Sequence, residues 1–213
     1  MTLETKDLPI FVTKASETKG DGPAGLLEAI VAVFGNVDMS GERIVQGAFD
    51  ASLAKKLPKG VWAHDWKRPL AKKLEAREVP PGDPILPEHL KELGGLYIKA
   101  QFNLDTQDGR DAFSNVSKGL FDEYSIGYYP TGRREAENAL ELTEIDLYEW
   151  SPVMVGCNRA TATISAKGAA KPDGEQDAAP GDKPDEQPGE KASDAESYSL
   201  HLRGALALAE IAV

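Results

Sequence analysis

The residue in this sequence best suited to nucleophilic chemistry is a serine in the run FDEYSIGYYP. On a strand, successive side chains point to opposite faces, so Tyr124, Ile126 and Tyr128 share one face and Ser125 and Gly127 share the other. The bulky face is then packed, while the hydroxyl of Ser125 lies beside a residue without a side chain. The pattern fits a loosely filled patch of sheet, or a nucleophile with room for a substrate that would lie against Gly127.

A carboxylate interrupts an apolar row in the run LTEIDLYEWSPVMV, which we expect to be a strand over residues 142–155. Strict alternation places Ile145, Leu147, Glu149 and Ser151 on one face with two valines. A carboxylate in such a row is costly to desolvate unless a cation or hydrogen-bond donors meet it. Glu149 therefore either pairs with a lysine or arginine at the sheet edge or belongs to a functional site.

The run VWAHDW holds the third candidate. If the run is extended, His64 shares a face with Trp62 and Trp66, and Asp65 points the other way. A histidine between aromatic residues is often simply packed in a core. Histidine is nevertheless the side chain best suited to transfer protons near neutral pH.

The three residue types together supply the parts of a serine hydrolase. A hydroxyl becomes a nucleophile when a base removes its proton, and the base needs a third group that fixes its orientation. An α/β-hydrolase is disfavoured, because Glu123 stands where the G-x-S-x-G motif requires a glycine. Cys157 is an alternative nucleophile, but its GCN context offers no activating neighbour and is typical of a small buried residue.

Composition limits the classes of function. The chain has 213 residues, 41% hydrophobic residues and a formal net charge of −11, which disfavours nucleic acid and anionic membranes as partners. No apolar run approaches the ~20 residues of a membrane span, and the first residues lack the apolar region of a signal peptide. One cysteine and three histidines provide neither a disulfide framework nor a zinc cluster. We expect an acidic protein of a reducing compartment, without metal or cofactor.

The chain divides by composition into four parts. Residues 1–23 form an N-terminal arm, and residues 24–166 form the predicted catalytic domain. Residues 167–197 are rich in Pro, Gly and acidic residues, so we expect a disordered acidic linker. Residues 198–213, YSLHLRGALALAEIAV, have apolar residues at helical spacing and predict a short C-terminal helix. That helix could pack back on the domain, act as a docking tag or belong to a cleavable tail.

The predicted domain reads as mainly β with helices, an α+β protein. Strands are expected over 26–34 and 96–104, and helices over 47–57 and 106–119, the second one capped by Thr106 or Asp105. In the second strand, Leu96 and its alternate neighbours face inward, and Tyr97 and its alternate neighbours face outward. Many strands with two short helical interruptions favour a β-barrel or a strongly bent sheet that carries helices.

As a set, these segments resemble the phage prohead maturation proteases of the HK97 type, whose fold is similar to that of the herpesvirus assembly proteases. The matching runs are VAVFGNVDMSGERIVQGAFDASL, the histidine of WAHDW, GLYIKAQFNLDTQDGRDAF, the serine of YSIGYY and LTEIDLYEWSPVMVGCNRAT. They follow the family's order and cover most of residues 26–161. The resemblance implies a herpesvirus-protease-like β-barrel with surrounding helices.

The resemblance also implies the chemistry and its setting. His64 would be the general base, Ser125 the nucleophile and Glu149 the orienting acid. The positional candidates for the oxyanion hole are the amides of Gly156, Cys157, Asn158 and Arg159, with the Arg159 side chain possible as an additional donor. The implied activity is cleavage of the scaffolding segment of the major capsid protein, and of the enzyme itself, inside the procapsid assembling in the host cytoplasm. The herpesvirus enzymes act as dimers, which makes a homodimer an arrangement to test. A non-catalytic capsid scaffold or assembly protein that keeps the barrel is the alternative function.

Overall fold

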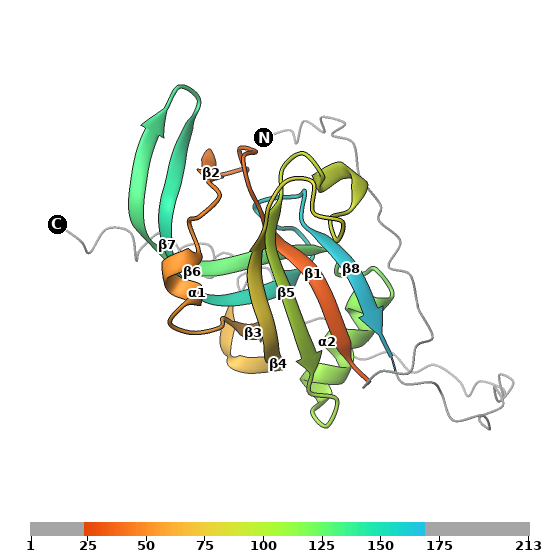
Figure 1. Ribbon diagram of the computed structural model, residues 1–213. Helices are drawn as coiled ribbons and strands as arrows, with labels where there is room; N and C mark the ends of the chain where they lie inside the picture. The colour runs from red at the N-terminus through yellow and green to blue at the C-terminus, as the bar shows by residue number, and fades with distance from the viewer. Residues whose placement is uncertain (1–23, 169–213) are drawn as a thin grey trace, which may run out of the picture. The chain divides into compact units, whose positions relative to one another are not determined.

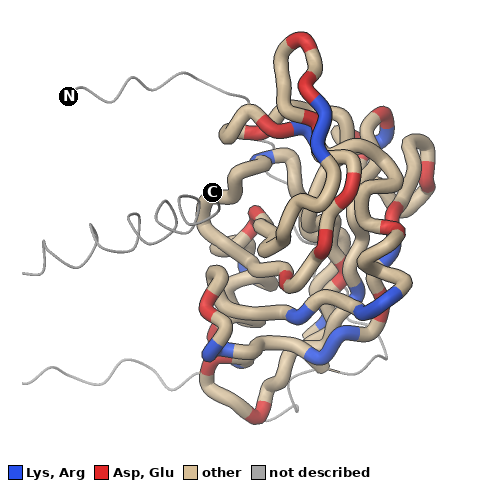
Figure 2. The backbone as a smooth tube through the Cα atoms, turned by 90° about the vertical axis from the view of Figure 1, so that its left-hand side faces the viewer, with Lys and Arg blue, Asp and Glu red and all other residues tan. Residues whose placement is uncertain are grey.

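The computed structural model describes residues 24–168. The predictions for the N-terminal arm, for the linker from residue 169 onward and for the C-terminal helix therefore lie outside the described residues. Figure 2 shows acidic and basic residues interspersed along the described backbone. No helix among residues 24–168 is long and apolar enough to cross a membrane.

The described residues form eight strands, two α-helices and one turn of 3₁₀-helix. The strands are β1 (Leu26–Val33), β2 (Glu42–Ile44), β3 (Lys59–Trp62), β4 (Asp65–Val79), β5 (Gly95–Phe102), β6 (Glu123–Ala136), β7 (Ala139–Val153) and β8 (Ala162–Lys167). The helices are α1 (Asp50–Leu53), η1 (Glu88–Leu90) and α2 (Gln107–Ser117).

Most of the predicted elements are confirmed. The strands expected over 26–34 and 96–104 are β1 and β5, and the helix expected over 106–119 is α2. The Thr106 hydroxyl caps α2 by accepting a hydrogen bond from the amide of Gly109 (3.1 Å). The helix expected over 47–57 is shorter, because only the single turn α1 forms within that range.

The strands form one mixed sheet with the order β2-β7-β3-β4-β5-β1-β8, and β6 pairs with β7 beside this path. The pairs β2/β7 and β3/β7 are parallel, and the other pairs are antiparallel. Figure 1 shows β6 and β7 running across β1, β5 and β8 in a second layer. Beyond these regular pairs, one parallel bridge joins Phe34, directly after β1, to Ile44 of β2. The regular strand pairs alone do not form a closed ring, so the sheet is strongly bent, and the closed barrel implied by the resemblance is not confirmed.

The main core lies between these two layers. Trp150 of β7 is fully buried and meets Phe102 of β5 at a ring-centroid distance of 6.4 Å and Tyr124 of β6 at 6.3 Å. Ile126 and Tyr128 pack against the same core, as the alternation in β6 predicts. The packed aromatic rings thus hold the strand that carries Ser125 against the strands of the first layer.

A second, smaller core covers the opposite face of β1 and β5. Tyr97 is only 3% exposed and packs there with residues that include Leu86 and Leu90 from the segment between β4 and β5. The prediction that Tyr97 faces away from the main core is correct, but this side of the sheet is not open to solvent. The segment over residues 80–94 provides the cover that simple alternation does not reveal.

A β-bulge in β7 changes which residues share a face. Gly127 pairs with Glu149 and Tyr128 with Leu147, so Tyr148 is an extra residue on β7. Ile145, Leu147 and Trp150 consequently lie in the main core, while Glu149 does not. The predicted single row from Ile145 to Ser151 is therefore wrong, because the bulge reverses the alternation before Glu149.

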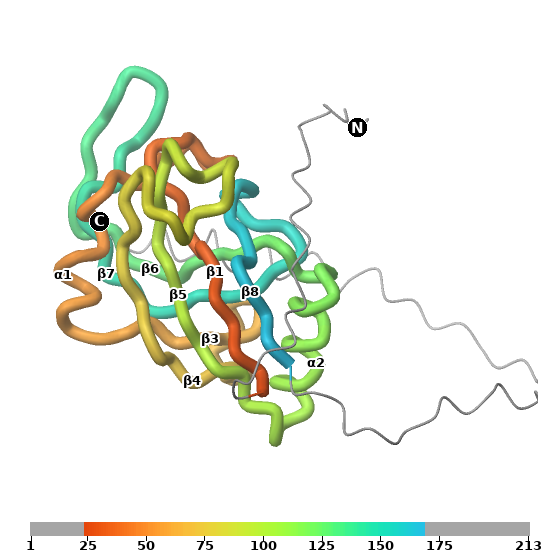
Figure 3. The backbone as a smooth tube through the Cα atoms, turned by 45° about the vertical axis from the view of Figure 1, so that its right-hand side comes forward, coloured from red at the N-terminus to blue at the C-terminus, as the bar shows by residue number. Residues whose placement is uncertain are grey.

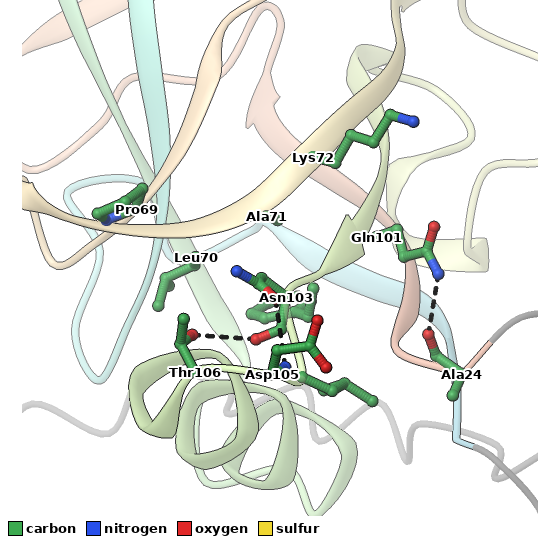
Figure 4. Close-up of a pocket in the computed structure, with 11 residues that line it drawn as sticks. Ala24, Pro69, Leu70, Ala71, Lys72, Gln101, Asn103, Asp105 and Thr106 are labelled. Atoms are coloured by element: carbon green, nitrogen blue, oxygen red, sulfur yellow. Dashed lines mark hydrogen bonds between the residues drawn. The ribbon is translucent and has the colours of Figure 1, made fainter.

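Helix α2 packs at one end of the sheet beside the end of β8 (Figure 3), and it also contacts β4 and β5. The rings of Phe113 and Phe102 lie 5.5 Å apart and join the helix to β5. A cavity of about 610 Å³ opens between β4 and the start of this helix, and its lining includes Leu70, Asn103 and Thr106 (Figure 4). Ser125, His64 and Glu149 do not line this cavity.

Removal of the α2 cap should destabilise the domain without changing its fold. We expect Thr106→Ala to lower the free energy of unfolding by about 1 kcal/mol, since the amide of Gly109 loses its acceptor. Urea unfolding followed by circular dichroism measures this change. Thr106→Ser keeps the hydroxyl and should retain most of the stability, and equal losses in both variants would contradict the capping role.

Candidate active site

The three residues singled out from the sequence meet in one row of hydrogen bonds. The Nε2 atom of His64 lies 2.9 Å from the Oγ of Ser125. The Nδ1 atom of the same ring lies 2.6 Å from Oε1 of Glu149. The structure thus brings the hydroxyl, the imidazole and the carboxylate together, although Ser125 and Glu149 lie 61 and 85 positions from His64 along the chain.

His64 lies in a tight turn and not on a strand. Trp62 pairs with Asp65, so Ala63 and His64 form a two-residue loop between β3 and β4. Both loop residues have positive φ, 42° for Ala63 and 65° for His64. A two-residue hairpin with positive φ at both positions has type I′ character. The extended conformation considered for VWAHDW is thus wrong at the histidine, and the turn projects the imidazole toward β6.

Two neighbouring residue pairs across β6 and β7 provide Ser125, Ser151 and Glu149 to the site. Ser125 pairs with Ser151, and Gly127 pairs with Glu149. A Cβ atom at Gly127 would lie 2.2 Å from Oε1 of Glu149. The space beside the serine that we expected for a substrate is thus occupied by the Glu149 carboxylate at this point. The contact of Gly127 with substrate stays a prediction.

The carboxylate is buried, whereas the imidazole is open. The Glu149 side chain is 1% exposed, and the His64 side chain is 45% exposed. Oε1 of Glu149 meets His64, and its Oε2 accepts a hydrogen bond from the Ser151 hydroxyl at 2.7 Å. These partners take the place of the edge lysine or arginine that we considered for Glu149.

This arrangement fixes one tautomer of the neutral imidazole. A carboxylate accepts hydrogen bonds, so Nδ1 of His64 carries the proton and donates a hydrogen bond to Glu149. Nε2 is then free to accept the hydrogen bond from the Ser125 hydroxyl. The ring therefore presents its basic nitrogen to the nucleophile, which is the protonation pattern that general-base catalysis by histidine requires.

A small cavity of about 80 Å³ lies beside Ser125. Its lining includes Glu42, Tyr128, Cys157 and Asn158. The Tyr128 hydroxyl donates to Oε2 of Glu42 at 2.6 Å. Burial, aided by the hydrogen bond to Glu42 and its charge, raises the pKa of Tyr128 above its ordinary value, so the phenol stays neutral.

The loop that holds the oxyanion candidates is fixed next to the nucleophile. The amide of Gly156 donates to Oε2 of Glu123 at 2.6 Å, which already provides that amide with an acceptor. The side-chain amides of Asn158 and Asn36 form a reciprocal pair, with both contacts at 3.0 Å. Cys157 and Asn158 line the cavity beside Ser125, whereas Gly156 and Arg159 do not.

Sequence reasoning missed the residues that support the site. In the sequence, Ser151 stands in the row of Glu149 without an evident role, and Glu123 only breaks the G-x-S-x-G motif. The Thr161 hydroxyl accepts from the amide of Tyr124 at 2.9 Å and so joins the loop to β6. No sequence motif marks these residues, since their partners come from distant segments. Across residues 24–168, no cluster of His, Cys, Asp or Glu could hold a metal ion.

Comparison with known proteins identifies the family of the chain. The family model of the caudovirus prohead serine proteases matches residues 11–173, which include all three residues of the row. The chain belongs to this family. No solved structure matches the chain significantly.

One curated relative of this prohead protease family member is the prohead protease of Enterobacteria phage HK97. The two chains are 31% identical over 121 residues, which cover 54% of this chain and 50% of the relative. The chain thus spans about half the length of the relative it matches.

A methyl group at Gly127 should disable the site with limited damage to the fold. We expect Gly127→Ala to displace the Glu149 carboxylate from His64, and a misplacement of this kind costs on the order of 10²-fold in rate. The rate at which a serine-reactive phosphonate labels the protein measures this effect. Gly168→Ala is the matched control, because its Cβ would meet only Phe113 at 3.8 Å. Equal labelling of both variants would contradict this account of Gly127.

Proposed function

We propose that this protein is a serine endopeptidase that acts through an acyl-enzyme. The observation that carries the proposal is the continuous row from the Ser125 hydroxyl through His64 to the buried Glu149, with contacts of 2.9 and 2.6 Å. Membership of the prohead serine protease family supports the same reaction class. A hydroxyl, an imidazole and a buried carboxylate in this order are the parts that such a mechanism needs.

The roles follow from the contacts. His64 Nε2 takes the proton of the Ser125 hydroxyl while Oγ attacks the carbonyl carbon of the scissile peptide bond. The imidazolium formed in this step is stabilised by Glu149, whose carboxylate accepts the hydrogen bond from Nδ1–H. His64 then gives its proton to the leaving amine, and the acyl-enzyme remains. A water molecule, activated by His64 in the same way, releases the second product and restores the serine.

We assign the oxyanion hole to the loop that follows β7. The tetrahedral intermediate needs donors within hydrogen-bond distance of its oxygen, and one such donor is typically worth ~3 kcal/mol of barrier. The amides of Cys157 and Asn158 are the better candidates, because both residues line the cavity beside Ser125. Gly156 is a weaker candidate because its amide donates to Glu123, and Arg159 could contribute through its exposed side chain.

The family supports a biological setting for this reaction. We assign as substrates the precursor of the major capsid protein, with its scaffolding segment, and the protease itself. These cleavages would take place inside the procapsid that assembles in the host cytoplasm. A homodimer is the oligomeric state to test. The HK97 relative is named a prohead protease, which is consistent with this setting.

Covalent labelling tests the reaction class directly. A serine-reactive phosphonate should modify wild-type protein at Ser125, and peptide mapping by mass spectrometry identifies the site. His64→Ala should abolish labelling, because the hydroxyl loses the base that removes its proton.

Asp65→Asn is the matched control, since the substitution removes a charge next to His64 at a residue outside the hydrogen-bonded row. Wild-type protein that ignores the reagent, yet assembles with capsid subunits, would replace the proposal with the scaffold function.

Self-cleavage should remove the segment that follows the domain. β8 pairs with β1 as far as Lys167, so we expect the cut to lie beyond that residue, where the chain leaves the sheet. Intact-mass spectrometry of the purified protein should show a shortened chain for wild type and the full-length chain for Ser125→Ala. The full-length mass in both proteins would contradict self-cleavage but would leave cleavage of other substrates open to the labelling test.

A further inference from the structure

We propose that Ser151 is a positioning residue of the catalytic row, a fourth member that fixes both His64 and Glu149. This inference rests on the proposed serine-protease function. The amide of His64 donates to Oγ of Ser151 at 3.0 Å, and the Ser151 hydroxyl donates to Oε2 of Glu149 at 2.7 Å. Together with the contact between His64 Nδ1 and Oε1 of Glu149, these bonds close a ring through three residues.

The hairpin that carries His64 needs such a link. The parallel pairing of β3 with β7 includes only Lys59 with Glu149 and Gly60 with Trp150. The turn at Ala63 and His64 lies beyond that pairing and has positive φ at both residues. The bond from the His64 amide to Ser151 joins the turn to β7 at the level of Ser125, because Ser125 and Ser151 are paired residues.

The carboxylate needs the same residue for a different reason. Glu149 is buried, so each of its oxygens requires a donor to offset the loss of hydration. His64 provides the donor for Oε1, and Ser151 provides the donor for Oε2. With both oxygens held, the carboxylate cannot rotate away from the imidazole. Ser151 therefore sets the backbone of His64 and the orientation of its partner with a single hydroxyl group.

The fold offers a matched serine that lacks this connection. Ser52 is 2% exposed, and its hydroxyl accepts a hydrogen bond from the amide of Leu147 on β7 at 2.8 Å. Like Ser151, it is a buried serine that bonds to β7. The Ser52 hydroxyl contacts Leu147 and Asp146, and neither residue belongs to the row. Loss of either hydroxyl removes buried hydrogen bonds, but only the loss at Ser151 should disturb the imidazole.

The test compares Ser151→Ala, Ser151→Cys and Ser52→Ala in the full chain. The phosphonate labelling rate of both Ser151 variants should fall about 10- to 100-fold, the loss expected when a hydrogen bond to a charged group is removed. With a peptide substrate, kcat should fall while KM stays near the wild-type value. Ser52→Ala should keep the wild-type labelling rate. Cysteine preserves the packing at the position and is only a weak donor, so it separates lost bonding from lost volume.

Two further measurements separate a positioning role from a merely structural one. The proton on Nδ1 of His64 should give a downfield NMR resonance in wild type that shifts or broadens in Ser151→Ala and persists in Ser52→Ala. In a His64→Ala background, Ser151→Ala should have no further effect on residual hydrolysis, because a residue that acts through His64 loses its influence with it.

The outcomes distinguish the two proposals. Wild-type protein that is not labelled would overturn the protease function and the role of Ser151 with it. Wild-type protein that is labelled, with Ser151→Ala labelled at the same rate, would overturn the role of Ser151 alone. Unfolding of both Ser151 variants, or an equal loss of labelling in Ser52→Ala, would assign Ser151 to stability instead of positioning.

Discussion

The site depends on one constraint, which is that a buried carboxylate needs a hydrogen-bond donor for each of its oxygens. Moving an ionised carboxylate out of water costs several kcal/mol even after the protein relaxes. Glu149 meets that cost with two donors, one for each oxygen, from His64 and Ser151. The same two bonds determine the direction of the imidazole. The two hydrogen bonds that offset the burial of the Glu149 carboxylate therefore also align the row that ends at Ser125.

Three departures from regular β-structure make this arrangement possible. The bulge at Tyr148 turns Glu149 away from the core row of Leu147 and Trp150. The absence of a side chain at Gly127 leaves room for the carboxylate on the neighbouring strand. The turn with positive φ at Ala63 and His64 brings the imidazole to the Glu149 carboxylate of β7. A regular sheet with ordinary residues at these points would separate the three functional groups.

The rest of the fold keeps these irregular points rigid. β7 is paired on both sides over part of its length, with β6 on one side and with β2 and β3 on the other. Trp150 fills the main core directly after Glu149, so the bulge is held by packing as well as by the ladder. The loop after β7 is joined to β6 through Glu123 and Thr161. The nucleophile, its partners and the candidate oxyanion donors thus share one rigid support, which is the condition for electrostatic catalysis without reorganisation.

The sequence by itself determined the elements whose patterns are local. The alternation in residues 96–104 and the cap at Thr106 predict β5 and α2, because burial and capping act over a few neighbouring residues. The residue types of the row were also readable, since a hydroxyl, an imidazole and a carboxylate on apolar patterns are rare and chemically suggestive. Glu149 was identified from an alternation that the structure does not keep. Its residue type therefore pointed to a function, while its surroundings depend on the bulge.

Only the tertiary structure decided how these residues meet. Ala63 and His64 lack the Asn-Gly or Asp-Gly pattern of a two-residue hairpin, so their turn could not be predicted from local sequence. The bulge depends on the register between two strands, and the role of Ser151 depends on partners at positions 64 and 149. The strand order of the sheet likewise depends on long-range pairing. Contacts between distant segments leave no periodic trace in the sequence, which is why the geometry of the site had to come from the fold.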